Sequence, residues 1–287
     1  MLQFFNSNII RNPLSRADGL RIWFRKVLWI VSSAGALALA SVFSQCTDPG
    51  TKMMAEPLKS PVVLELFTSQ GCSSCPPADR LLLQLHNEGY VHGREVIVLS
   101  HHVDYWNRLG WKDPYSSAEA SQRQEYYARA LSKRGLYTPQ MVIDGRYETV
   151  GHNESQIRNA IQASQVDSSD SIGELAIFLA RNATGTLLVS ASSSRELTSD
   201  ERLFLVLVQD GLSNPVPRGE NANRTLTHDG VVLGFWAMEP SQTPGRYSRI
   251  LDTDSRDGEY RIVVLHQKNS GEIIDASQID YNPRKLR

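Results

Sequence analysis

Two cysteines three positions apart, Cys72 and Cys75, carry the clearest chemistry in the sequence. They follow a short β-prone run, Pro61 to Phe67, and precede Pro76-Pro77 and a run with helical periodicity. A thiol at the start of a helix faces unpaired amides and the positive end of the helix dipole, which favour the thiolate. We therefore predict a redox pair in which an exposed Cys72 attacks and Cys75, one turn deeper, resolves the mixed disulfide.

The residues around the cysteines leave alternatives open. Pro76 and Pro77 are compatible with a helix start, because the first four amides of a helix lack an intrahelical acceptor. An inert disulfide that staples the helix start is one alternative. A zinc site is another, although zinc needs a second ligand pair and no other CxxC exists in the chain.

A histidine pair follows the next expected strand, Glu95 to Ser100. Ligands bind at the carboxyl ends of strands in open α/β sheets, so His101 or His102 can exchange a proton with a cysteine there. Asp104 would fix the imidazole ring. The alternative is that these side chains anchor the long loop from Trp106 to Tyr115 by hydrogen bonds.

The rest of this half alternates helices and strands. Ser116 to Glu119 form a capping box, and the helix that follows is expected to run to Arg134 and end at Gly135. Asp144-Gly145 predicts a hairpin turn, and a helix over Asn153 to Ala163 closes the half. The expected order is β-α-β-α-β-β-α.

This order resembles the thioredoxin fold, with the CxxC after the first strand and Thr138-Pro139 before the third. A proline at that place is a candidate for a cis peptide bond. The resemblance implies that Pro139 is cis and packs beside the cysteines, where it shapes the path of a substrate chain. Thr138, Gln140 and Trp106 are the neighbouring residues expected to contact substrate. Asp104 and His102 complete the expected catalytic set.

More narrowly, the sequence is similar to a family of secreted bacterial proteins known only as domain of unknown function 1223. The matching stretches are ELFTSQGCSSCPPAD (Glu65 to Asp79), HVDYWNRLGWKDP (His102 to Pro114), YTPQMVIDG (Tyr137 to Gly145) and RGENANRTLTHDGVV (Arg218 to Val232). Two residues depart from ordinary thioredoxins. Gly71 stands where an aromatic residue usually precedes the first cysteine. Thioredoxins carry a buried acidic residue in the first strand, and Glu65 lies close to that position. Glu65 either replaces this buried acid, or it faces outward or forms a salt bridge.

From Ser171 onward the pattern changes to strands separated by turn signals. The expected strands cover 174–179, 186–190, 203–208, 231–236, 260–265 and 272–279. The predicted fold class is therefore an α/β thioredoxin-like domain over residues 61–168 followed by a smaller all-β, sandwich-like domain over residues 169–287.

A polar segment, Arg218 to Asp229, interrupts these strands. It is consistent with a lid or binding edge near the cysteines, with Arg224 or His228 touching a ligand. The commoner explanation is a solvated loop and hairpin with Asp229-Gly230 as the turn.

The first 45 residues predict an export leader or membrane anchor. Val27 to Phe43 is uncharged and mostly apolar, and it follows a basic region with a net charge of +4. Residues 46–60 are expected to form a linker, in which Cys46 is either lipidated or a lone cysteine. The body is thus predicted to be exported to the periplasm or cell envelope, with membrane contact only through the leader or that lipid.

Composition limits the classes of function. Hydrophobic residues make up 41% and charged residues 21% of 287 residues, as is usual for a globular protein. The net charge of -1 leaves -5 for the part after the basic leader, so we expect no nucleic-acid partner.

The main hypothesis is an exported thiol–disulfide oxidoreductase that acts through Cys72 and Cys75 on protein thiols or disulfides, without cofactor or metal, with a membrane redox partner as a further option. One alternative is a copper-binding chaperone that uses the CxxC and a histidine such as His102. Another is a redox-inert binding module with a structural disulfide.

Overall fold

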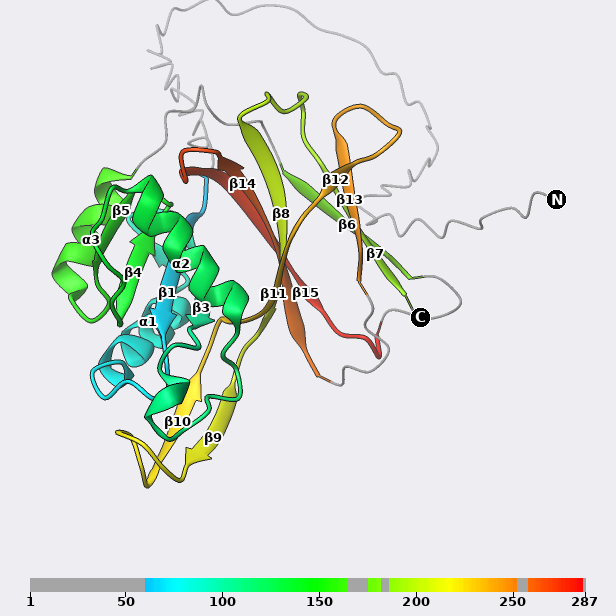
Figure 1. Cartoon of the computed structure of the whole chain (residues 1–287). Helices are drawn as coiled ribbons and strands as arrows, with labels where there is room; N and C mark the ends of the chain where they lie inside the picture. Colours follow the sequence, from blue (N-terminus) through cyan, green and yellow to red (C-terminus); the bar gives the residue numbers. More distant parts are fainter. Residues whose placement is uncertain (1–59, 165–174, 182–185, 252–257, 286–287) are drawn as a thin grey trace, which may run out of the picture. The chain divides into compact units, whose positions relative to one another are not determined.

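The computed structural model describes residues 60–164, 175–181, 186–251 and 258–285 (Figure 1). The predicted leader, almost all of the linker with Cys46, and the domain boundary at 168/169 lie outside these residues. Among the described helices, none is long and apolar enough to cross a membrane.

The first half of the described chain contributes four neighbouring strands to one sheet, in the order β3-β1-β4-β5. They are β1 (Val62–Thr68), β3 (Arg94–His102), β4 (Gln140–Ile143) and β5 (Tyr147–Val150), with the short β2 (Tyr90–Val91) paired to β3. β1 runs parallel to β3 and antiparallel to β4. The predicted turn between β4 and β5 is confirmed, since Asp144 and Gly145 have φ of 47° and 63°, as a type I′ turn needs.

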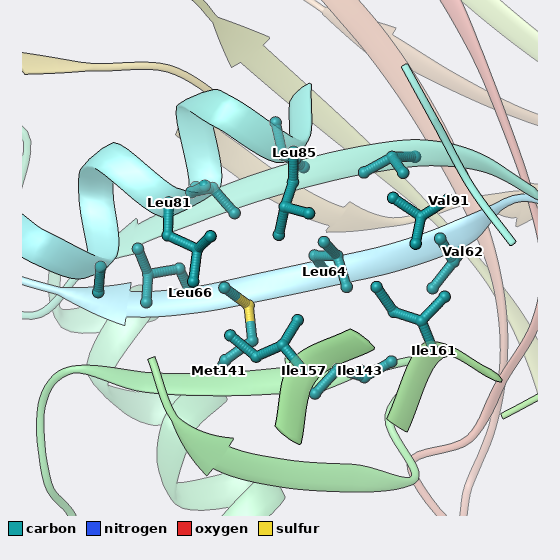
Figure 2. Close-up of a cluster of buried hydrophobic side chains, with 14 residues drawn as sticks. Val62, Leu64, Leu66, Leu81, Leu85, Val91, Met141, Ile143, Ile157 and Ile161 are labelled. Atoms are coloured by element: carbon teal, nitrogen blue, oxygen red, sulfur yellow. The ribbon is translucent and has the colours of Figure 1, made fainter. Parts of the chain in front are cut away.

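Two helices, α1 (Pro76–Glu88) and α3 (Glu154–Ala163), cover one face of these strands. Side chains at alternate positions of β1 point toward them, because successive side chains of a strand face opposite sides. Figure 2 shows this cluster of buried apolar residues, which includes Leu64, Leu66, Leu81, Leu85, Met141, Ile143, Ile157 and Ile161. The hydrophobic effect thus fixes α1, and with it the cysteines at its start, against the sheet.

The other face is covered by α2 (Ala118–Ala130), which is shorter than predicted and begins one residue later. Its N-cap is Ser117, whose hydroxyl accepts a hydrogen bond from an amide of the first turn. The hydroxyl of Ser116, the predicted cap, instead donates to the carbonyl of Asp113. The helix ends before Ser132, which has a φ of 52°.

The predicted fold class is wrong. Each strand expected after residue 171 has a counterpart among the described residues, but four strands continue the first sheet instead of forming a separate domain. These four are β8 (Glu201–Gln209), β11 (Val231–Ala237), β14 (Tyr260–Lys268) and β15 (Ile273–Tyr281). The described chain therefore has one mixed nine-stranded sheet in the order β15-β14-β8-β11-β3-β1-β4-β5, with β2 beside β3 (Figure 1).

The two halves join where β11 pairs with β3. Val231 is in parallel register with Ser100, and the Ser100 amide donates to the carbonyl of Gly230 at 2.6 Å. Residues of both halves then share one buried cluster, made up of Val63, Ile97, Leu99, Val206, Val208, Val263, Leu265, Ile273 and Ala276. Burial of this apolar surface holds the second half against the first, in addition to a buried cluster that the second half forms by itself.

The remaining strands form two small sheets. β12 (Glu239–Pro240), β13 (Arg246–Leu251), β7 (Leu187–Ser192) and β6 (Ala176–Arg181) pair in that order and pack on β8 and β14. The continuous apolar run of β8 reflects this position, because one of its faces packs on the small sheet and the other on the shared cluster. β9 (Leu212–Val216) and β10 (Arg224–His228) form an antiparallel hairpin.

We predict that Ile97→Ala lowers the free energy of unfolding by about 2–5 kcal/mol, because it leaves a cavity in the shared cluster. Since both halves contribute to that cluster, urea denaturation followed by tryptophan fluorescence and circular dichroism should show one transition, shifted to lower urea. Ile250→Ala, at a position 65% exposed, is the control and should change stability by less than about 0.5 kcal/mol. Two separate transitions, with only one shifted by Ile97→Ala, would contradict the shared core.

Candidate functional site

A disulfide joins Cys72 and Cys75 at the amino end of α1, with 5.5 Å between their Cα atoms. Cys75 is the N-cap residue and has helical backbone angles, and its amide donates to the carbonyl of Cys72. Pro76 and Pro77 occupy the first two helical positions, as predicted. The sequence therefore places the pair where the helix dipole acts on it.

Both cysteines are fully buried, so the expected exposure of Cys72 is not found. Only the two serines between them are exposed. The Sγ atom of Cys72 lies 3.4 Å from Oγ of Ser74 and 3.9 Å from the carbonyl oxygen of Thr138. A disulfide sulfur carries no hydrogen, so the contact with Thr138 can become a hydrogen bond only when Cys72 is a thiol.

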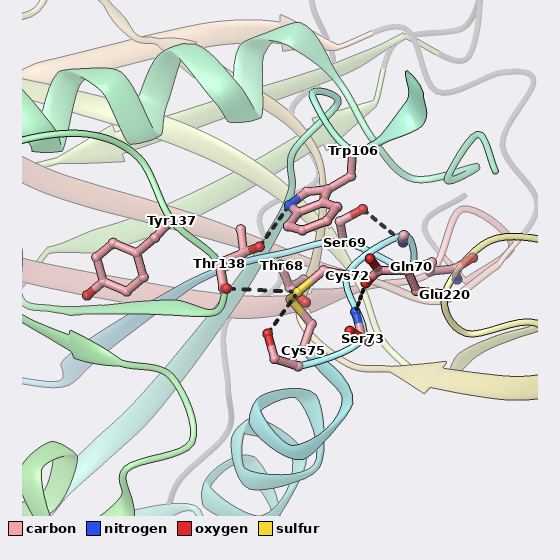
Figure 3. Close-up of a disulfide and its surroundings, with 12 residues drawn as sticks. Thr68, Ser69, Gln70, Cys72, Ser73, Cys75, Trp106, Tyr137, Thr138 and Glu220 are labelled. Atoms are coloured by element: carbon pink, nitrogen blue, oxygen red, sulfur yellow. Dashed lines mark hydrogen bonds between the residues drawn. A yellow bond between two sulfur atoms is a disulfide. The ribbon is translucent and has the colours of Figure 1, made fainter. Parts of the chain in front are cut away.

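The peptide bond between Thr138 and Pro139 is cis, as predicted. The hydroxyl of Thr138 accepts a hydrogen bond of 2.8 Å from the indole N–H of Trp106 (Figure 3). A Cβ atom on Gly71 would lie 3.1 Å from Cβ of Trp106. Residues 69–75, which connect β1 to α1, are called the cysteine loop. Trp106 occupies the space beside this loop, which explains why glycine precedes Cys72.

The loop of the β9–β10 hairpin, residues 217–223, covers the cysteine loop from the other side. Glu220 Oε2 accepts a hydrogen bond of 2.9 Å from the amide of Ser73 (Figure 3). The fully buried Asn221 donates through Nδ2 to the carbonyls of Gln70 and Cys72, both at 2.9 Å. The polar segment is therefore neither simply a solvated loop nor a hairpin turned at Asp229-Gly230, because its tip contacts the cysteine loop.

Gln70 connects the cysteine loop to the stem of this hairpin. Its side-chain oxygen accepts from the indole N–H of Trp111, which can only donate. Its amide nitrogen therefore donates to Oδ1 of Asn214 at 2.6 Å and to Nε2 of His228 at 3.1 Å. Accordingly, His228 carries its proton on Nδ1, 3.7 Å from Oδ1 of Asp79.

His102 is oriented by Asp113 and not by Asp104. Its Nδ1 lies 2.7 Å from Oδ2 of Asp113, which also accepts from the amide of Gln70. Burial acts to raise the pKa of Asp113, but the electrostatic interaction with His102 and these hydrogen bonds together lower it. Asp104 accepts a hydrogen bond from Ser121 of α2. His102 thus anchors the loop after β3, which was the alternative interpretation of this histidine.

The rings of His102 and His228 are 4.6 Å apart between centroids, and both residues are buried. Among the residues that the structure describes, His102 Nε2 and His228 Nδ1 have no hydrogen-bond partner. Neither residue is exposed enough to touch a ligand directly in this conformation. Arg224, the other expected contact in the hairpin, is exposed and donates to Oδ1 of Asn221 at 3.0 Å.

His101 faces the opposite side of β3 and belongs to a second buried network. Its Nε2 lies 2.8 Å from Oε2 of Glu65, which also forms an ion pair with Arg123 of α2. Burial lowers the pKa of His101, so its ring is neutral and donates to the carboxylate. Arg123 and His101 hold the pKa of Glu65 well below its usual range despite complete burial. Glu65 is thus a salt-bridged residue of the α2 face, away from the α1 face that carries Cys75.

The structure therefore brings together only part of the expected site. The residues that lie close together are Cys72, Cys75, Thr138, Pro139 and Trp106. Gln140 is buried elsewhere, and its side-chain amide accepts a hydrogen bond from Gln124 and donates one to Glu148. The sequence analysis did not single out three contributors to this region, namely Asp113, Glu220 and Asn221. The sequence signals for them were indirect: Glu220 and Asn221 lie in the polar segment for which a lid is one interpretation, Asp113 lies in the loop after the histidine pair, and all three fall inside the quoted family stretches.

The copper interpretation requires a histidine beside the cysteines. The side chain of His102 instead contacts Asp113, Tyr115 and His228. Within the parts of the chain that the structure describes, no group of three or more His, Cys, Asp or Glu side chains is arranged to hold a metal ion.

The chain belongs to the family described as "Protein of unknown function (DUF1223)", which matches residues 63–267. No curated protein matches the sequence.

Two solved structures are similar to this chain. The crystal structure of protein AGR_C_4864 from Agrobacterium tumefaciens is 26% identical in sequence, with a TM-score of 0.57 over 76% of this chain and 93% of the other. HBP35 of Porphyromonas gingivalis is 17% identical, with a TM-score of 0.55 over 77% of this chain and 75% of the other. The second likeness concerns the fold alone.

We predict that Glu65→Gln lowers the free energy of unfolding by about 3–5 kcal/mol, because it leaves the buried Arg123 without its anionic partner. Chemical denaturation measures this change. Glu125→Gln is the control, since Glu125 is half-exposed on α2 and lies 3.9 Å from Arg129. Its expected effect is below about 0.5 kcal/mol, and equal effects of the two substitutions would contradict the account.

Proposed function

We propose that this protein is an exported thiol–disulfide oxidoreductase whose reactive pair is Cys72 and Cys75. The observation that carries the proposal is the disulfide at the start of α1, with Cys72 beside the carbonyl of Thr138 and the cis Pro139. The positive end of the α1 dipole would stabilise a thiolate on Cys72 after reduction. Export, as the sequence predicts, would place the pair where disulfides persist.

The exchange proceeds in two steps that balance. A thiolate of the client protein attacks Sγ of Cys72, the Cys72–Cys75 bond breaks, and Cys75 leaves as the thiolate. A second client thiolate then attacks the client sulfur of the mixed disulfide and releases Cys72. The client has gained a disulfide, and its two electrons reside on the cysteine pair; the same steps in reverse reduce a client disulfide.

Cys72 is the point of attack because its Sγ lies beside the carbonyl of Thr138 and the cis Pro139, whereas Cys75 is the N-cap of α1. Since Cys72 itself is covered, the exchange also needs a shift of residues 217–223. The two hydrogen bonds of Asn221 to the cysteine loop are the contacts that such a shift must break.

We predict that Cys72→Ser abolishes exchange with a model client, measured as reduction of insulin and oxidation of reduced ribonuclease. Cys75→Ser should instead accumulate a mixed disulfide between Cys72 and the client, seen by mass spectrometry, because no resolving thiol remains. Equal activity of both variants and the parent would refute the proposed function.

We predict that Asn221→Ala speeds reduction of the buried disulfide by dithiothreitol about thirtyfold. Each of the two lost hydrogen bonds is worth about 1 kcal/mol, so the fraction of molecules with an open loop rises by that factor. The rate is followed by alkylation of free thiols and mass spectrometry. Thr227→Ala, which removes an exposed hydroxyl from the same hairpin, is the control and should leave the rate unchanged. An unchanged rate in Asn221→Ala would mean that this loop does not limit access.

A further inference from the structure

Glu220 places a carboxylate on the backbone amide next to the reactive cysteine. Its Oε2 accepts from the amide of Ser73 at 2.9 Å, and Ser73 directly follows Cys72 (Figure 3). The side chain and the backbone amide of Ser73 both lower the pKa of the Glu220 carboxyl by hydrogen bonding, so it is ionised at neutral pH. Glu220 is exposed, and none of the ion pairs among the described residues includes it.

The charge of Glu220 lies close to the place where a thiolate on Cys72 would form, because the amide that it binds belongs to the next residue, Ser73. The dipole of α1 favours such a thiolate, whereas a nearby carboxylate opposes it by like-charge repulsion. The disulfide form carries no charge on sulfur, so it is not opposed in this way.

We propose that Glu220 is a positioning residue that favours the oxidised form of the Cys72–Cys75 pair and opposes the Cys72 thiolate. This inference rests on the proposed function. It also assigns the long-range contact between the hairpin and the cysteine loop a role in setting the redox balance.

The redox step defines where the charge appears. When a client dithiol reduces the pair, the client sulfurs form a disulfide and the Cys72–Cys75 bond breaks, so two electrons pass to the pair. Cys75 takes up one of the two client protons as a thiol, the other proton is released to water, and Cys72 remains a thiolate. That negative charge arises beside the carboxylate of Glu220.

The other charged residues of α1 and of the β9–β10 hairpin are the same in the parent and in Glu220→Gln. Asp79 lies in the first turn of α1 and is buried, where it accepts a hydrogen bond from Thr68. On the hairpin, Arg218 and Arg224 are exposed, and Arg224 donates to Asn221.

The test compares Glu220→Gln with the parent in glutathione buffers of graded potential. Glutamine keeps an oxygen that can accept from Ser73 and removes only the charge. We expect the equilibrium with glutathione to shift about threefold toward the reduced pair, which corresponds to about 14 mV less negative. Alkylation of Cys72 by iodoacetamide in the reduced protein should also become about threefold faster at pH values below its thiol pKa.

Both effects should shrink as salt is added, because exposed charges are screened. A purely structural role of Glu220 would not produce this salt dependence. Glu239→Gln, which removes an equal charge from the exposed strand β12, is the control and should behave as the parent.

The outcomes separate this inference from the proposed function. If the parent titrates as a redox couple and Glu220→Gln matches it in potential and alkylation, the inference is wrong and the oxidoreductase proposal stands. If the parent stays oxidised below about -300 mV, the pair is a structural disulfide and both proposals fail.

Discussion

The pairing of β11 with β3 is the constraint on which the rest of the structure depends. Because Val231 lies in register with Ser100, near the carboxyl end of β3, the residues just before it are held at that end of the sheet. Those residues are the β9–β10 hairpin, and the cysteine loop begins where the neighbouring β1 ends. One short parallel contact therefore both merges two halves into one sheet and brings Glu220 and Asn221 onto the cysteine loop.

The alternation of side chains along β3 separates two buried polar networks. His101 points toward α2, where it joins the ion pair of Glu65 and Arg123. His102 points toward α1 and contacts Asp113 and His228. Because a strand turns successive side chains to opposite faces, two adjacent histidines have different roles. The first network ties α2 to the sheet, and the second ties the hairpin and the loop after β3 to the region beneath the cysteines.

Local signals in the sequence predicted much of what is local in the structure. The cysteines at a helix start, the prolines behind them, the cis bond before Pro139 and the turn at Asp144-Gly145 each depend on a few adjacent residues. The single sheet could not be predicted in this way, because it depends on apolar surfaces of Ile97 and Val206 that meet only after folding. The contact of the segment Arg218 to Asp229 with the cysteine loop was predicted only as the less common alternative, because Glu220 lies 147 positions from the amide it binds. The burial of Cys72 was not predicted, because contacts between such distant residues leave no periodic pattern in the sequence.

The central claim is that Cys72 and Cys75 form a redox-active pair and not a structural disulfide. The most direct measurement is the fraction of free thiols on these two residues after equilibration of the protein in glutathione buffers of graded potential. The account predicts a reversible couple between roughly -120 and -270 mV, with the fold intact in both forms. A pair that remains oxidised below about -300 mV, or that unfolds the chain when reduced, would contradict it.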